Sequence, residues 1–220
     1  MAINLTKGQK IDLKKSSGES LTNFCVGVNW GAIETKSGFL GLSKKVQSID
    51  LDLSCILVND QDKITDHLYS PLYREEVLKQ FGLQKGKLLT TDGAMKHTGD
   101  DLAGDTGGDD GLDNEIITVD LARINANVTQ IFFFLNNAGK EDFSQIPYSK
   151  IRMYEGTPTK VVSEFASYNV SAEGQYAGKR SIIMGKLYKR DGEWKFSAIG
   201  DPTEDTFLGQ TVQRIVKSYL

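Results

Sequence analysis

The side chains best suited to bind a ligand lie close together in one glycine-rich segment, GDDLAGDTGGDDGLDNE, which covers residues 99–115. The segment has no lysine or arginine, and its seven acidic residues are Asp100, Asp101, Asp105, Asp109, Asp110, Asp113 and Glu115. At a separation of ~6 Å and an effective dielectric constant of ~20, two carboxylates repel each other by roughly 2 to 3 kcal/mol. A bound cation would offset this repulsion, so the segment predicts a metal site.

The glycines of the segment favour calcium as the metal. Glycine adopts the positive φ angles that other residues avoid, so the backbone can turn side chains and carbonyl oxygens toward one point. Ca²⁺ takes about six to eight oxygen ligands and tolerates irregular geometry better than Mg²⁺ does. The alternative is an acidic loop exposed to solvent, as most runs of like charges are.

The spacing of the acidic residues differs from that of an EF-hand, which has oxygen ligands at its loop positions 1, 3 and 5. Counting from Asp105 or from Asp109 places a glycine at position 3. The sequence therefore requires a calcium site of another kind.

Further ligands are expected on the neighbouring strands. Asp50 and Asp52 are two residues apart in a predicted strand and would project from the same face. A polar end of a strand is an equally good interpretation of that pair. Glu115 begins a strand directly after the acidic segment, which makes it the best-fixed candidate ligand. His97 is expected to hydrogen-bond a ligating carboxylate, although an ordinary structural histidine is the more common case.

The sequence contains little evidence for a catalytic motif. His67 and His97 are the only histidines and lie in no zinc-binding pattern, and no G-x-S-x-G motif occurs. The glycine–lysine stretches 82–87 and 174–179 lack the spacing and the hydroxyl residue of a phosphate-binding loop. We therefore expect no enzyme. A metal-dependent hydrolase and a purely structural interaction protein are the two alternatives to a calcium-binding protein.

The composition limits the possible partners and location. The 220 residues include 26 Lys and Arg and 29 Asp and Glu, and outside the acidic segment the net charge is +4. Without a long basic cluster, nucleic acid is not an expected partner. The start of the chain has no apolar run typical of a signal peptide, and no segment is long enough to be transmembrane. We expect a cytoplasmic protein whose Cys25 and Cys55 are buried free thiols.

Short β-type segments separated by turns dominate the sequence, which predicts an all-β protein, an antiparallel β-sandwich of two sheets. Residues 131–135 are apolar throughout, as in a strand covered on both faces. Asp191-Gly192 predicts a tight hairpin turn. The expected strands are residues 3–5, 24–30, 49–58, 115–121, 130–136, 150–154, 160–165, 180–189 and 194–199.

Short peripheral helices and a C-terminal helix are expected to pack on the sandwich. Ser70-Pro71 predicts a helix that ends at Gly82. Asp201, followed by a proline, predicts the N-cap of the C-terminal helix. We interpret residues 1–220 as a single domain with excursions at 35–45 and 69–92.

Several motifs resemble the TerD-type stress-protein family, known for tellurium resistance. The family pattern G-D-N-x-T-G-x-G-x-G-D-D-E-x-I is similar to Gly99-Asp100, Gly104, Gly108 to Asp110 and Glu115-Ile116, and its D-L-D-x-S motif to residues 50–54. Residues 5–8, 26–30 and 192–200 resemble its L-x-K-G, V-G-L-G-W and G-E-W-K-F-x-A-x-G motifs. The resemblance implies a β-sandwich that binds calcium, usually two ions, and acts with protein partners in a stress-response assembly, without established catalysis.

This sequence also departs from the family pattern. Asp101, Ala103 and Thr106 replace an Asn, a Thr and a Gly, and residues 111–114 are inserted before Glu115. Gly31 stands where many relatives carry Asp, a ligand that the inserted Asp113 can replace. One or two calcium ions are therefore expected. The excursion at 69–92 is absent from shorter family members, which suggests a subgroup with its own partner.

Overall fold

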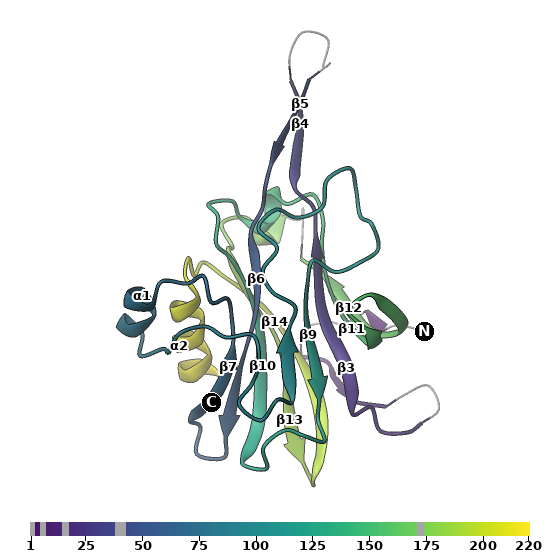
Figure 1. The fold of residues 1–220 in the computed structure, drawn as a ribbon, viewed down its shortest axis with the longest axis vertical. Coiled ribbons are helices and arrows are strands. Elements are labelled where there is room, and N and C mark those ends of the chain that lie inside the picture. Colours follow the sequence, from purple (N-terminus) through teal and green to yellow (C-terminus); the bar gives the residue numbers. More distant parts are fainter. Residues whose placement is uncertain (1–2, 5–7, 15–17, 38–42, 171–173) are drawn as a thin grey trace.

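The computed structural model describes residues 3–4, 8–14, 18–37, 43–170 and 174–220 of the chain. Two six-stranded sheets pack face to face, and two helices lie on the outer side of one sheet (Figure 1). This arrangement confirms the β-sandwich with a C-terminal helix that the sequence predicts.

The first sheet carries the end of the acidic segment. All neighbouring strands in it are antiparallel except β1, which pairs in parallel with β12. In β3, every residue from Phe24 to Trp30 is buried, because the core covers one face, and the acidic segment and a small cluster of Cys25 with Tyr154 cover the other. The strands in spatial order are β1 (Ile3–Asn4), β12 (Lys160–Asn169), β11 (Ser149–Thr157), β3 (Asn23–Trp30), β9 (Glu115–Asp120) and β8 (Met95–His97).

The second sheet is covered on both faces. In β10, Ile131 and Phe133 belong to the core between the sheets, whereas Phe132 and Phe134 pack in a second cluster beneath the helices. This confirms the two-sided burial expected for residues 131–135. The strands in spatial order are β2 (Lys10–Asp12), β14 (Glu193–Thr203), β13 (Ser181–Arg190), β10 (Val128–Asn137), β6 (Leu51–Asn59) and β7 (Ile64–Leu68).

The two helices are shorter than the sequence suggests. The C-terminal helix α2 spans Leu208–Ser218, so the predicted start at Asp201 is wrong. Asp201 and Pro202 lie in β14, where they pair with Ile183 and Ile182 of β13. Tertiary pairing with a long neighbouring strand therefore overrides the local capping signal.

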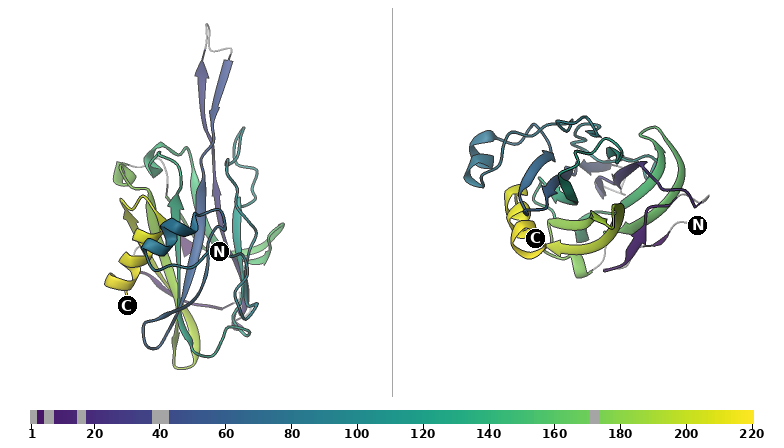
Figure 2. Two further views of the ribbon diagram at one scale, coloured as in Figure 1. Left: turned by 60° about the vertical axis from the view of Figure 1, so that its left-hand side comes forward. Right: turned by 90° about the horizontal axis from the view of Figure 1, so that it is seen from below.

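The first helix, α1, spans Glu75–Gln80, and its predicted start at Ser70 is also wrong. The Ser70 hydroxyl accepts a hydrogen bond from the amide of Leu72 in a turn that precedes the helix. The helix ends at Gln80 with Phe81 as its C-cap, and Gly82, at which the sequence predicts the end, follows with a φ of 71°. Figure 2 shows α1 and α2 on the same side of the second sheet.

A two-stranded arm of β4 (Ile33–Ser37) and β5 (Ser43–Gln47) projects from the end of the sandwich (Figure 1). It occupies the predicted excursion at 35–45, of which residues 38–42 lie outside the described part of the chain. The strand predicted at 3–5 is present as β1, and Leu5 lies outside the described residues.

Other local predictions are confirmed. Asp191 and Gly192 have φ angles of 54° and 82° and form the turn between β13 and β14. Cys25 and Cys55 are both free and buried. Two single 3₁₀ turns, η2 (Phe143–Gln145) and η3 (Gly174–Tyr176), complete the described elements.

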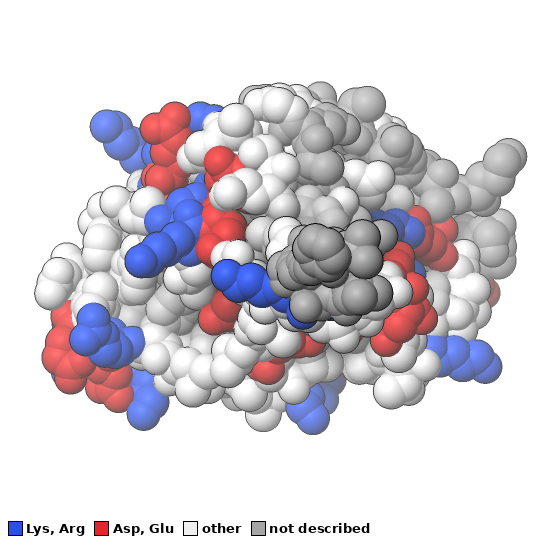
Figure 3. Space-filling model, turned by 90° about the horizontal axis from the view of Figure 1, so that it is seen from above, with Lys and Arg blue, Asp and Glu red and all other residues white. Residues whose placement is uncertain are grey.

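The arm end of the molecule carries charges of both signs. Seen from above, acidic and basic side chains are interspersed on this face (Figure 3). One such pair lies in the arm itself, where Nζ of Lys44 lies 2.5 Å from a carboxylate oxygen of Glu34.

Candidate metal site

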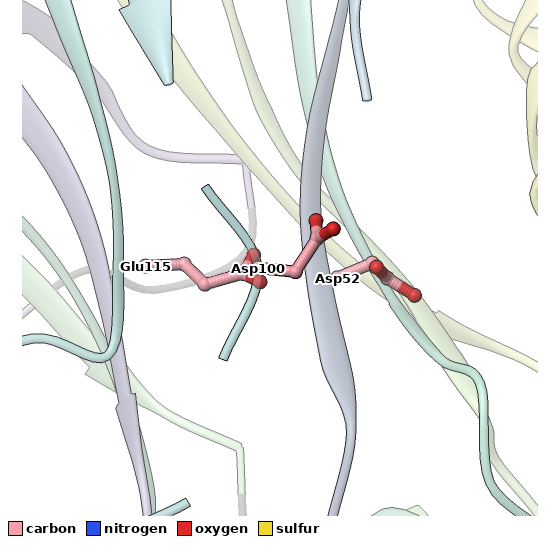
Figure 4. A group of neighbouring side chains, drawn as sticks. All are labelled: Asp52, Asp100 and Glu115. Carbon is pink, nitrogen blue, oxygen red and sulfur yellow. The ribbon is translucent and has the colours of Figure 1, made fainter. Parts of the chain in front are cut away.

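In the described part of the chain, carboxylates converge in two groups of three. The first group contains Asp52, Asp100 and Glu115, with ligand oxygens within 4.8 Å of one another. Asp52 lies in β6 of the second sheet, Glu115 begins β9 of the first sheet, and Asp100 belongs to the acidic segment (Figure 4). The group therefore joins the two sheets of the sandwich at one point.

Glu115 is held by backbone groups from two other segments. Its Oε2 accepts a hydrogen bond of 2.7 Å from the amide of Leu53, and its Oε1 accepts one of 3.1 Å from the amide of Asp101. The Glu115 side chain is fully buried. Burial raises the pKa of Glu115, although these hydrogen bonds and His97 oppose the shift.

Two hydroxyl groups from the excursion at 69–92 contact the other members of the first group. The Tyr73 hydroxyl donates to Oδ2 of Asp52 at 2.7 Å, and the Ser70 hydroxyl donates to Oδ2 of Asp100 at 2.8 Å. Burial raises the pKa of Asp52 well above its ordinary value, and the nearby carboxylates of Glu115 and Asp100 add to this effect.

Asp50 lies beside the first group. It precedes β6 instead of lying within it, yet burial and the charges of Asp100 and Asp101 raise the pKa of its carboxyl group. Oδ1 of Asp50 and Oδ1 of Asp100 are both buried without a hydrogen-bond partner. A buried carboxylate oxygen without a partner is costly, and a metal ion is one way to satisfy it.

His97 contacts the first group but its ring is already engaged. Its Nε2 lies 3.0 Å from the carbonyl oxygen of Leu53 and 3.4 Å from Oε2 of Glu115. Its Nδ1 accepts a hydrogen bond of 2.9 Å from the amide of Gly99. Because Nδ1 is an acceptor, the neutral ring carries its proton on Nε2.

The second group contains Asp105, Asp109 and Asp110. Oδ2 of Asp105 accepts hydrogen bonds from Nδ2 of Asn29 at 3.2 Å and from the hydroxyl of Tyr148 at 3.0 Å. Asp109 and Asp110 are exposed. This group is therefore open to solvent, in contrast to the first.

Asp101 and Asp113 lie outside both groups. Oδ1 of Asp101 accepts hydrogen bonds from the amides of Ala103 and Gly104, which shape the turn that follows. Both carboxylate oxygens of Asp113 accept from Nε of Arg152, at 2.8 and 3.0 Å. The acidic segment thus distributes its side chains between possible metal ligands and structural contacts.

Sequence reasoning missed the groups that orient these carboxylates: Asn29, Ser70, Tyr73, Asn114, Tyr148 and Arg152. Only Asn29 carries a local signal, since it is a polar residue inside a run of buried apolar residues. Asn114 lies within the acidic segment itself, and the remaining four reach the carboxylates from segments that are distant along the chain.

The match to a protein-family model settles the relationship of this chain to known proteins. The TerD domain model matches residues 1–215. The chain belongs to the TerD family. Stress response protein SCP2 of Bacillus subtilis (strain 168) is 33% identical over 222 residues, which cover 98% of this chain and 100% of that relative. Tellurium resistance protein TerZ of Serratia marcescens is 30% identical, covering 90% of this TerD-family chain and 89% of TerZ.

A solved structure shares the fold of this TerD-family protein. It is that of a homologue of telluride resistance protein (TerD) from Streptomyces coelicolor A3(2), with a TM-score of 0.57 and 12% sequence identity. The superposition covers 84% of this chain and 91% of the other. In the described part of the chain, no helix is both long and apolar enough to span a bilayer.

Proposed function

We propose that this TerD-family protein is a cytoplasmic calcium-binding protein of the stress response, in which the metal orders the acidic segment as a surface for protein partners. The unpartnered, buried oxygens of Asp50 and Asp100 support this proposal most strongly. A divalent cation would satisfy both oxygens and offset the repulsion among their neighbours. The relatives named for tellurium resistance and stress response support the biological setting.

The residues that would hold the metal are the two carboxylate groups. Asp52, Asp100 and Glu115, with Asp50 beside them, would bind one ion, and Asp105, Asp109 and Asp110 would bind a second. Hard oxygen donors on irregular loops suit Ca²⁺ better than Mg²⁺, which requires compact octahedral geometry. The metal would supply charge neutralisation and a fixed loop conformation.

The contacts of the two histidines give little support to a hydrolytic function, because a hydrolase needs a base that can activate water. His97 engages both ring nitrogens in buried contacts. His67 contacts the carbonyl oxygen of Lys85 through Nε2 and stacks on Tyr69. Neither ring is placed to activate a water molecule at the second, exposed carboxylate group. We therefore propose a binding function without catalysis.

Calorimetric titration of Ca²⁺ into chelator-stripped protein tests this proposal. We expect heat from one or two sites and a higher melting temperature, because a ligand at a hundred times its Kd stabilises the folded state by about 2.7 kcal/mol. Mg²⁺ at the same concentration should shift the melting temperature much less. The absence of both heat and thermal shift at millimolar Ca²⁺ would contradict the proposal.

A further inference from the structure

Asp113 and Arg152 form a buried ion pair behind the acidic segment. The side chain of Asp113 is fully buried and that of Arg152 is 11% exposed. In addition to its two hydrogen bonds with Asp113, the guanidinium donates from Nη2 to the carbonyl oxygen of Gly111 at 2.9 Å. One cation therefore holds both a side chain and a backbone group of residues 111–114.

The sheet is built to accept this pair. Arg152 lies in β11 between Ile151 and Met153, which belong to the core, so its side chain projects from the outer face of the first sheet. The residue that pairs with Arg152 on the neighbouring strand β3 is Gly27. A Cβ atom at Gly27 would lie 2.1 Å from Oδ2 of Asp113, so only glycine leaves room for the carboxylate.

Residues 111–114, which Arg152 holds, connect directly to the second carboxylate group. The amide of Asn114 donates to the carbonyl oxygen of Val28 at 2.9 Å. Nδ2 of Asn114 donates to Oδ1 of Asp105 at 2.9 Å, and Nδ2 of Asn29 donates to the carbonyl oxygen of Leu112. Residues 111–114 thus orient the carboxylate of Asp105 through the side chain of Asn114.

We propose that Arg152 is a positioning residue that acts as a permanent internal cation. It neutralises Asp113 and fixes residues 111–114 before any metal binds, so that Asp105, Asp109 and Asp110 are already arranged to receive an ion. The metal part of this inference rests on the proposed calcium-binding function. The ordering of residues 111–114 by Arg152 does not depend on it.

Electrostatics alone gives the opposite expectation for metal affinity. A guanidinium near a metal site repels the ion, so its removal would strengthen binding. A positioning role predicts weaker binding on removal, because the unliganded segment must then be ordered at the expense of the binding free energy. The sign of the change therefore separates the two roles.

Hydrogen exchange and calorimetry on Arg152→Gln test the inference. In chelator-stripped protein we expect the amide of Asn114 to exchange at least about tenfold faster in the variant, because its local opening becomes easier. Calorimetry should show one calcium site weakened by about 10- to 100-fold, as for the loss of other groups that orient metal ligands. The weakened site should be that of Asp105, Asp109 and Asp110, and the site of Asp52, Asp100 and Glu115 should keep its affinity.

Arg190→Gln is the matched control. It makes the same substitution at an arginine of β13 whose Nε lies 3.6 Å from the carboxylate of Asp191 at the hairpin turn. We expect this variant to keep both the exchange rate of Asn114 and the calcium affinities of the original protein.

The results distinguish the two proposals. Unchanged exchange in Arg152→Gln, or tighter calcium binding, would overturn the role of Arg152 while leaving calcium binding intact. If the original protein binds no calcium, the proposed function fails. Hydrogen exchange in metal-free protein still tests whether Arg152 orders residues 111–114.

A second variant protects the test against misfolding of the first. Asp113→Asn keeps the shape of the side chain and removes its charge. We expect faster exchange at Asn114 and the same number of bound calcium ions, because Asp113 is not a ligand in this arrangement. A loss of one ion without a change in exchange would overturn the inference.

Discussion

The hydroxyl of Tyr73 lies 2.7 Å from Oδ2 of Asp52 and connects the excursion at 69–92 to the first carboxylate group. The Tyr73 ring also packs edge-on against Phe207 at a centroid distance of 5.5 Å, just before α2 begins. The position of the excursion is thus fixed both by α2 and by a carboxylate that we propose as a metal ligand. The excursion therefore forms one wall of this site.

Replacing Tyr73 by Phe should destabilise the metal-free protein. The change leaves Oδ2 of the buried Asp52 without its donor, at an expected cost of about 1–3 kcal/mol. Calcium should reduce this cost, because the ion would satisfy the same carboxylate. Urea unfolding with chelator and with calcium measures both values.

Tyr69→Phe provides the control for that experiment. The Tyr69 hydroxyl donates to the carbonyl oxygen of Gln84 at 2.7 Å, within the same excursion and away from the carboxylates. Its loss should cost the same with and without calcium. An equal calcium effect on both variants would contradict a specific link between Tyr73 and the metal.

The two carboxylate groups should behave as separate sites. Asp100→Asn should weaken binding of one ion, and Asp110→Asn should weaken binding of the other, because each variant removes a charged ligand from one group only. Calorimetry resolves the two sites. Asp191→Asn, which changes an exposed acidic residue at a hairpin turn, should alter neither affinity. Loss of both ions in either variant would indicate one shared site.

The pair Asp205–Arg214 should make stability depend on pH in the acid range. Burial acts to raise the pKa of Asp205, but hydrogen bonds from Arg214 and Thr203 outweigh it and hold the pKa below the ordinary value of an aspartate. A lowered folded-state pKa stabilises the protein above the unfolded pKa, and this contribution is lost as pH falls through the folded-state value. Asp205→Asn should therefore destabilise at pH 7 by about 1.5–3 kcal/mol, the range for hydrogen bonds to a charged group.

The difference between Asp205→Asn and the original protein should shrink as pH falls below about 4, because the unfolded chain then binds a proton at Asp205 that the folded protein binds only at a lower pH. Urea unfolding at pH 7 and at pH 3.5 measures the change. Glu204→Gln is the neighbouring control, since its ion pair with Lys179 is exposed and should contribute little at either pH. A constant difference for Asp205→Asn would contradict the assignment.

Both cysteines should be unreactive in the folded protein. Burial raises the pKa of the thiols of Cys25 and Cys55, and only the thiolate reacts readily. A thiol reagent at pH 8 should label neither residue in native protein and both in urea. Rapid labelling of the native protein would show that one of the two strands opens.

Nine of the fourteen strands in the described part of the chain, and the two-sided burial of residues 131–135, could be predicted from sequence, because alternation and apolar runs are local signals. The short strands β2, β7 and β8 were not predicted. The boundary at Asp201 could not be predicted. Asp201-Pro202 has the local form of a helix start, but its pairing with β13 depends on a strand some twenty residues away. The same limit applies to β4 and β5, whose residues are largely polar, although Ile33 packs against the core.

The acidic segment identified the candidate site from sequence. It did not show which of its acidic residues belong to the two carboxylate groups and which make structural contacts. Asp113 looks like the other acidic residues in sequence, and only the approach of β11 brings Arg152 to it. Likewise, nothing in the sequence marks Tyr73 and Ser70 as partners of Asp52 and Asp100, because their contacts form only when the excursion folds against β6. Contacts between distant segments leave no local pattern for sequence reasoning to use.

The burial of the second sheet on both faces has a consequence for mutational tolerance. In β6, Cys55 and Leu57 face one apolar cluster while Ile56 and Val58 face the other, so a polar substitution at any of these four positions disturbs packing. In β11, by contrast, Ile151 and Met153 contact the core, whereas Lys150 lies on the other face with its side chain 36% exposed. A saturation library should show intolerance of polar residues at all four of these positions in β6, whereas in β11 it should show intolerance at Ile151 and Met153 and tolerance at Lys150.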